Sequence, residues 1–109
     1  MKANKTPASR PHDAAVVDML KADPEFADAY LAAALEEADE PGGQAALLAA
    51  LRHIAEAQGM AAVAQRAGIP RESLYRALSP SGNPTIKTLL AVLGAAGLQL
   101  ALTRPEEHA

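Results

Sequence analysis

A short stretch of the chain, residues 60–78, has the residue spacing of a helix-turn-helix, and this spacing constrains the fold more than any other feature. The stretch reads MAAVAQRAGIPRESLYRAL, with Ala64, Gly68 and Leu74 at the positions that such a motif requires. A small alanine lets two helices cross closely, and glycine ends the first helix because it adopts a left-handed backbone at little cost. Leu74 is predicted to face inward. The second helix therefore keeps one face free.

The free face of this second helix carries charged and polar side chains that suit the reading of DNA bases. Arginine donates two hydrogen bonds to guanine, and glutamate accepts one from cytosine. We therefore predict that the helix enters a major groove. An ordinary surface helix of mixed charge is the alternative. The predicted DNA-binding residues are Arg66, Arg71, Glu72, Ser73, Tyr75, Arg76 and Lys87.

The net charge of −3 is distributed unevenly along the chain. Residues 12–40 hold nine acidic residues and one lysine, a net charge of −8, whereas residues 59–103 hold four basic residues and one glutamate. The basic half suits phosphates and the acidic half suits a basic partner. Because four bases make a small electrostatic footprint, we expect a homodimer to bind DNA.

Four acidic residues cluster where a predicted helix ends, although the helix dipole disfavours negative charge there. Selection for a basic partner and a simple solvated helix end explain this cluster equally well. The predicted partner-binding residues are Glu36, Glu37, Asp39 and Glu40.

Composition excludes several classes of protein. The chain of 109 residues fits one domain with a modest core, and half of its residues are apolar. It contains only three aromatic residues and no cysteine, which excludes disulfides and thiolate zinc sites. The histidines have no metal-site spacing, and His53 is predicted to form a surface pair with Glu56. No nucleophile–base pair or phosphate-binding glycine loop occurs, so we expect no enzyme activity, no metal and no cofactor.

The sequence also lacks the signals of a membrane or secreted protein. No apolar run approaches the ~20 residues that span a bilayer. The basic N-terminus has no apolar stretch of the secretory type. We therefore expect a cytoplasmic protein.

Hydrophobic periodicity predicts helices over about 13–22, 24–38, 44–58, 60–67, 71–78 and 84–95. Asp23 is expected to cap the second of these, with Pro24 in its first turn. The domain is predicted to cover residues 13–103, between a disordered tail over 1–12 and a tail over 104–109. Alternatively, the basic residues of the first tail form an arm that binds in the minor groove of DNA. These residues are Lys2, Lys5 and Arg10.

The end of the domain has an alternating pattern. Leu98, Leu100 and Leu102 alternate with less apolar residues, which predicts a short β-strand. A lone strand leaves its backbone unpaired, so we expect the same strand of a second copy to pair with it across a two-fold axis. These three leucines are thus the predicted dimerisation residues. An extension of the preceding helix is the alternative.

Several segments resemble one known family. DPEFADAYLAAALEEAD, LLAALRHIAEAQGM and AGIPRESLYRALSPSGNPTIKTLLAVLGAAGLQL resemble the HigA-type antitoxins, often called addiction-module antidote proteins, of the wider Xre-like repressor superfamily. The similarity runs from about His12 to Leu102, and RESLYRALS and GNPT are its most specific parts. Pro70 departs from the usual capping residue, and Pro41-Gly42-Gly43 departs in a loop.

The resemblance implies an all-α fold of five to six short helices with a lambda-repressor-like helix-turn-helix, to which we add the short C-terminal strand. It also implies a small bacterial antitoxin, encoded beside a RelE/ParE-like toxin that is commonly an mRNA-cleaving ribonuclease. Such proteins silence the toxin and repress their own operon by binding double-stranded operator DNA. An acidic surface suits a toxin directed at RNA. Two alternatives stay open: a stand-alone or prophage-derived transcriptional regulator without a toxin, and a helical interaction module that does not bind DNA.

Overall fold

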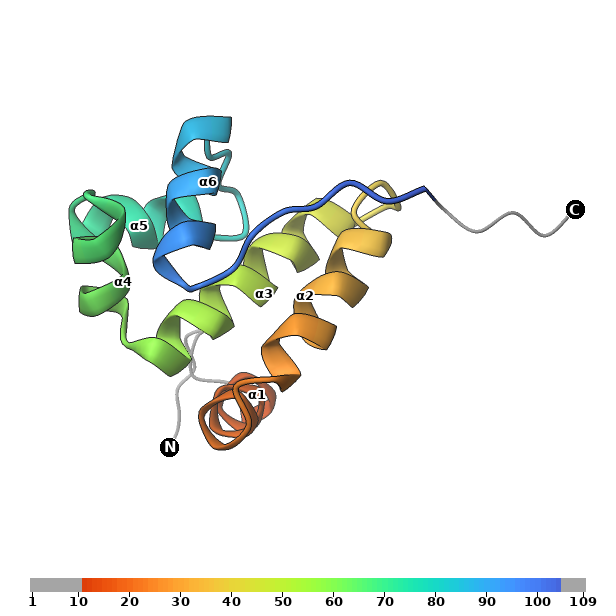
Figure 1. Cartoon of the computed structure of the whole chain (residues 1–109), viewed down its shortest axis with the longest axis horizontal. Helices are drawn as coiled ribbons and strands as arrows, with labels where there is room; N and C mark the ends of the chain where they lie inside the picture. The colour runs from red at the N-terminus through yellow and green to blue at the C-terminus, as the bar shows by residue number, and fades with distance from the viewer. Residues whose placement is uncertain (1–10, 105–109) are drawn as a thin grey trace, which may run out of the picture.

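The computed structural model describes residues 11–104, with side chains from Asp13 onward, and this part of the chain contains six helices (Figure 1). The predicted all-helical class is confirmed, and each helix boundary lies within two residues of its predicted place. The helices are α1 (Pro11–Ala22), α2 (Phe26–Glu36), α3 (Gly43–Gln58), α4 (Met60–Ala67), α5 (Arg71–Ala77) and α6 (Ile86–Ala95).

The predicted tails lie almost wholly outside the described residues. Residues 1–10, which include the candidate arm residues Lys2, Lys5 and Arg10, are among them, as are residues 105–109. Helix α1 begins at Pro11, two residues before the predicted start of the domain.

The start of α2 differs from the prediction for Asp23. The N-cap of α2 is Glu25, and it makes no side-chain capping hydrogen bond. Instead, the backbone carbonyl of Asp23 accepts a hydrogen bond from the amide of Phe26 at 2.9 Å. Pro24 and Glu25 thus form a turn before the helix begins, so the assignment of Asp23 as the cap was wrong.

Helix α3 lies at the centre of the fold. Figure 1 shows α1 and α2 on one side of it and α4, α5 and α6 on the other. Helix α3 contacts α1, α2 and α4, and α4 in turn contacts α5 and α6. Because helices cover α3 on both sides, its buried residues extend beyond a single stripe; they are Gly43, Leu48, Ala50, Leu51, His53, Ile54 and Ala55.

The turn between α4 and α5 has the predicted geometry. Gly68 has a φ of +75°, and the amide of Ile69 donates a hydrogen bond to the carbonyl of Ala64 at 3.1 Å. This pattern is a Schellman motif, which satisfies carbonyls at the end of a helix. Leu74 has no exposed surface, and Ala64 is 3% exposed. The predicted burial of Ala64 and Leu74 and the predicted left-handed turn at Gly68 are therefore confirmed.

Two glycine-to-alanine substitutions should change stability in opposite directions. At both Gly68 and Gly94, an added Cβ would meet no heavy atom within 4 Å, so only the backbone conformation differs. We expect Gly68→Ala to lower the free energy of unfolding by about 1 kcal/mol because its φ is positive. Gly94→Ala lies within α6 and should raise it by roughly 0.5–1 kcal/mol. Urea denaturation of both variants checks this, and a loss at both positions would contradict it.

The predicted C-terminal strand is not seen. Helix α6 ends at Ala95, and Gly97 follows it with a φ of +82°. The amide of Leu98 donates a hydrogen bond to the carbonyl of Leu93 at 2.8 Å. The chain then leaves the helix and crosses in front of α3 toward α2 (Figure 1). Residues 98–104 have no regular structure, because no other described segment offers a strand to pair with. Both the strand and the helix extension were therefore wrong for the single chain.

Only the first of the three C-terminal leucines belongs to the core. Leu98 packs against the apolar cluster, whereas Leu100 is 47% exposed and Leu102 is 98% exposed. Of the alternating leucines, only Leu98 thus anchors the C-terminal segment to the rest of the protein.

Candidate nucleic-acid and partner-binding surfaces

Helix α5 exposes the polar residues that were predicted to read DNA. Its inner side is closed by Leu74 and by Leu78, which follows the helix and is 1% exposed. Arg71, Glu72 and Arg76 are all exposed on the outer side. Neither Glu72 nor Arg76 makes a side-chain hydrogen bond or ion pair with any residue from 11 to 104. These side chains are therefore available to a partner.

An arginine and a tyrosine are stacked on the same face of α5. The guanidinium carbon of Arg71 lies 5.7 Å from the centre of the Tyr75 ring, which is 39% exposed. A cation above an aromatic ring is attracted to it. The stack holds two extended side chains together, whereas Ser73 lies half-buried on the other side of α5. The structure thus brings together five of the predicted residues on α5.

A shallow groove with both polar and apolar lining runs beside α5. It lies between that helix, the loop over residues 79–85 and the first turn of α6. A Cβ at Gly82 would overlap the carbonyl oxygen of Ala77, so only glycine lets the loop lie this close to α5. The polar side chains that line the groove are Ser73, Arg76, Ser79, Ser81, Asn83, Thr85 and Thr88. Sequence reasoning missed the loop residues, although the GNPT segment was a signal.

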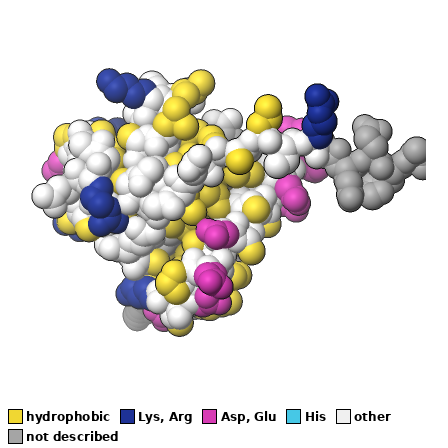
Figure 2. Space-filling view, viewed as in Figure 1, with side chains coloured by type: hydrophobic (Ala, Val, Ile, Leu, Met, Phe, Trp, Pro, Cys, Tyr) yellow, Lys and Arg dark blue, Asp and Glu magenta, His cyan; other side chains and the backbone are white. Residues whose placement is uncertain are grey.

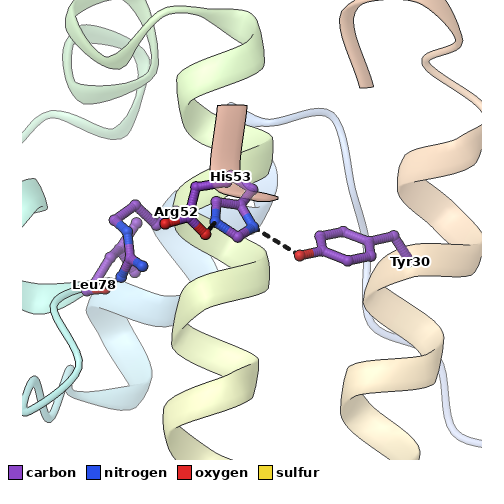
Figure 3. Close-up of polar contacts among 5 residues, drawn as sticks. Tyr30, Arg52, His53 and Leu78 are labelled. Atoms are coloured by element: carbon purple, nitrogen blue, oxygen red, sulfur yellow. Dashed lines mark hydrogen bonds and ion pairs between the residues drawn. The ribbon is translucent and has the colours of Figure 1, made fainter. Parts of the chain in front are cut away.

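A partly buried hydrogen bond joins the end of α5 to the central helix, α3. Nη1 of Arg52 on α3 donates a hydrogen bond to the carbonyl of Leu78 at 2.7 Å (Figure 3). The guanidinium satisfies the hydrogen-bonding capacity of a carbonyl at the end of a helix, where the helix itself supplies no donor. Nothing in the local sequence pattern predicts this contact, because the two residues are distant in sequence. It restrains the orientation of α5 relative to the rest of the fold.

Arg66 lies elsewhere and has structural partners. Its Nε donates a hydrogen bond to the carbonyl of Ala95 at 2.8 Å, and its Nη2 donates one to Oε1 of Gln58 at 3.0 Å. The Nε2 of Gln58 also donates to the carbonyl of Ala96 at 2.8 Å. Arg66 and Gln58 therefore cap the end of α6. The remaining predicted residue, Lys87, is exposed in the first turn of α6.

His53 does not form the predicted surface pair with Glu56. His53 belongs to α3, and its side chain is buried, since the residue is only 3% exposed. The hydroxyl of Tyr30 on α2 lies 2.7 Å from Nδ1 of His53 (Figure 3), and Oδ1 of Asp13 on α1 lies 3.0 Å from Nε2. The prediction failed because α3 is covered on both sides. The histidine instead joins three helices through two polar contacts.

The Tyr30 hydroxyl makes the free energy of unfolding depend on pH in the alkaline range. Burial raises the pKa of this hydroxyl above its usual value of 10.0; the charge of Asp13 raises it further, and Arg52 opposes the shift. The folded state therefore holds the proton more tightly than the unfolded state. Its contribution to stability is complete below the unfolded pKa and is lost as the pH rises through the folded pKa.

Tyr30→Phe should separate this effect from other alkaline titrations. At neutral pH the variant loses the hydrogen bond to His53, and we expect it to be less stable by about 1 kcal/mol. Above pH 10 the difference in unfolding free energy between the wild type and the variant should shrink. Guanidinium denaturation between pH 8 and pH 11.5 measures that difference, and a constant value over the series would contradict the assignment.

A second, acidic surface lies on the other side of the molecule. Glu36 ends α2, and the other three predicted acids lie in the turn that follows; all four are exposed. Figure 2 shows acidic side chains along α2, and Figure 1 places α2 and α5 on opposite sides of α3. A Cβ at Gly43 would overlap the carbonyl oxygen of Glu37, so this turn is tightly packed. The four acids are Glu36, Glu37, Asp39 and Glu40.

The described residues form neither a metal-binding cluster nor a membrane-spanning helix. Within residues 11–104, no group of three or more histidine, aspartate or glutamate side chains is arranged to hold a metal ion. None of the six helices has the length and hydropathy needed to cross a bilayer.

Comparison with known proteins gives one family. A family model described as "probable addiction module antidote protein" matches residues 9–104. The chain is 51% identical over 53 residues to an uncharacterized protein of Haemophilus influenzae, in an alignment that covers 49% of this chain and 55% of the relative. The match thus spans about half the length of that relative. No solved structure matches the chain.

Proposed function

The chain belongs to the family of probable addiction module antidote proteins, and from this premise we propose that it is an antitoxin of the HigA type that also represses its own operon. Membership of an antidote family implies a regulatory protein that acts by binding and not as an enzyme. One observation carries the proposal. The exposed basic residues of α5 and the exposed acidic residues at the end of α2 lie on opposite sides of α3, so two partners can bind at once.

The α5 surface is the proposed contact with double-stranded operator DNA. The α4–α5 pair acts as the helix-turn-helix of the Xre-like superfamily, with α5 in the major groove. Arg71 and Arg76 read guanine, and Glu72 reads cytosine. Three other residues support them: Ser73, Tyr75 and Lys87. Arg66 has a minor role at most, because its guanidinium already binds the end of α6.

The acidic surface is the proposed contact with the toxin. A RelE/ParE-like toxin acts on RNA or on complexes that contain nucleic acid, so its surface must carry positive charge. Complementary charge on the antitoxin speeds the encounter of the two proteins. The proposed contact residues are Glu36, Glu37, Asp39 and Glu40.

The active repressor is proposed to be a homodimer. One chain offers few positive charges to the phosphates of an operator, whereas two copies double that number and read two half-sites. Of the C-terminal leucines, Leu102 is the residue on which the proposed dimer contact mainly rests, because it is 98% exposed. Leu100 is 47% exposed and lines a groove beside α2, so it lies at the edge of that contact. Leu98 contributes indirectly, because it packs against the core of its own chain.

Co-purification tests the proposed function. The chain is expressed with a catalytically inactive form of the protein encoded by the adjacent reading frame, and the mixture is titrated with a duplex from the upstream region. We expect a stable protein complex that retains specific DNA binding. DNA binding without a protein complex would instead identify a stand-alone or prophage-derived regulator. A protein complex without DNA binding would identify a helical interaction module.

A further inference from the structure

A groove lined mainly by aliphatic side chains lies between α2 and the segment that follows α6. It has a volume of about 360 Å³. Ala32 and Leu35 form its α2 wall, Leu98 and Leu100 form the opposite wall, and Leu31 is buried at its base. Figure 2 shows hydrophobic side chains in this region, between α2 and the C-terminal segment. The groove keeps large aliphatic side chains in contact with solvent, since Leu35 is 42% exposed and Leu100 is 47% exposed.

The edge of this groove is negatively charged. Asp28 lines the groove itself, one helical turn before Ala32, and Glu36 follows Ala32 by one further turn. Residues four apart lie on the same side of a helix, so an acid stands at each end of the α2 wall. The groove therefore combines an apolar wall with a rim of carboxylates, and the four-acid cluster continues that rim.

We propose that this groove binds an amphipathic segment of the toxin whose apolar side chains are flanked by lysine or arginine. The inference rests on the proposed antitoxin function and deepens it, because it adds an apolar anchor to the acidic cluster. Charge complementarity selects the occupant: an apolar segment flanked by acids would be repelled by Asp28 and Glu36, whereas a basic one would be attracted. A second copy of this chain would bring the same acids against each other.

The wall and the rim of the groove have different effects on binding. Apolar side chains that become buried at the centre of an interface, away from water, hold a complex together. They therefore govern its dissociation rate. Exposed charges at the rim steer the encounter and govern the association rate and its dependence on salt. This difference separates an anchoring groove from a simple acidic patch.

The test measures binding kinetics of the full chain to immobilised, catalytically inactive toxin from the adjacent reading frame. Leu35→Gln removes apolar surface from the α2 wall and Ala32→Gln places an amide in it, both without a change of charge. Met19→Gln is the matched control, because Met19 is an exposed apolar residue on α1. We expect the double variant of the wall to dissociate about tenfold faster or more, with an unchanged association rate, while the control behaves as the wild type.

A rim variant completes the comparison. Reversal of Glu36, Glu37, Asp39 and Glu40 to lysine should slow association and reverse its salt dependence, because salt then screens a repulsion, with a smaller effect on dissociation. Unchanged dissociation of the wall variant from a toxin that the wild type binds would overturn the proposed groove and leave the antitoxin function intact. A loss of dimer mass in the wall variant, by light scattering, would also overturn it and assign the groove to a second copy. A wild type that fails to bind the toxin would remove the proposed function itself.

Discussion

Replacement of both Arg71 and Arg76 by alanine is expected to abolish specific operator binding while the fold stays intact. Both side chains are exposed on the outer side of α5, and Arg76 has no partner among the described residues. Each arginine that reads a guanine contributes about 1–3 kcal/mol of discrimination. The pair should therefore lower affinity for the operator by at least about 30-fold per chain. A dimer presents the pair twice, which increases the loss.

Lys21→Ala is the matched control for this experiment. Lys21 is an exposed basic residue at the end of α1, away from α5. Its replacement removes one positive charge, as each of the two arginine substitutions does. The control should bind the operator nearly as well as the wild type. Circular dichroism and a thermal melt would verify that all the variants are folded. Operator binding by the double variant that equals the wild type would show that α5 is not the reading helix.

Leu74→Ala should produce the largest loss of stability of any single alanine substitution in α5. The leucine has no exposed surface, and it lies in the interface between α5 and the core. Removal of a buried leucine side chain leaves a cavity and typically costs about 2–5 kcal/mol. Domains of this size are stable by roughly 5–15 kcal/mol, so the loss is a large fraction of the total. Urea denaturation measures it directly.

An exposed leucine provides the comparison for Leu74. Leu90 lies on α6 and is 50% exposed, so Leu90→Ala should change the free energy of unfolding by about 0.5 kcal/mol or less. Operator binding by the folded fraction of Leu74→Ala should also weaken, because α5 would no longer rest on a filled core. Equal stability of the two variants would contradict the burial of Leu74 and the fixed orientation of α5.

The local pattern of the sequence predicted the helices because each has its own apolar stripe and a clear end signal. Gly68 and Leu74 could be placed correctly, since their roles depend on neighbours a few residues away. The roles of His53 and Arg66 could not be predicted in the same way. His53 is buried because helices from both halves of the chain cover α3, and Arg66 binds a helix end that is distant in sequence.

The C-terminal segment shows a different limit of sequence reasoning. Alternating leucines are typical of a strand, but a strand also needs a backbone partner, and the pattern of one chain carries no information about that. Here Leu98 packs on the core, whereas Leu102 lies in solvent. The groove beside α2 was missed for a related reason, because its two walls come from segments about sixty residues apart in the chain.

A fluorescence anisotropy titration of the wild-type protein tests the central claim most directly. The labelled duplex carries the region upstream of the gene, a scrambled duplex of the same composition is the comparison, and the titration is made at about 50 and 200 mM salt. We expect tighter binding to the upstream duplex, together with an affinity that falls steeply as salt increases, because phosphate contacts release counterions. Equal affinity for both duplexes, or binding that is absent at the lower salt concentration, would contradict a repressor that reads its own operator through α5.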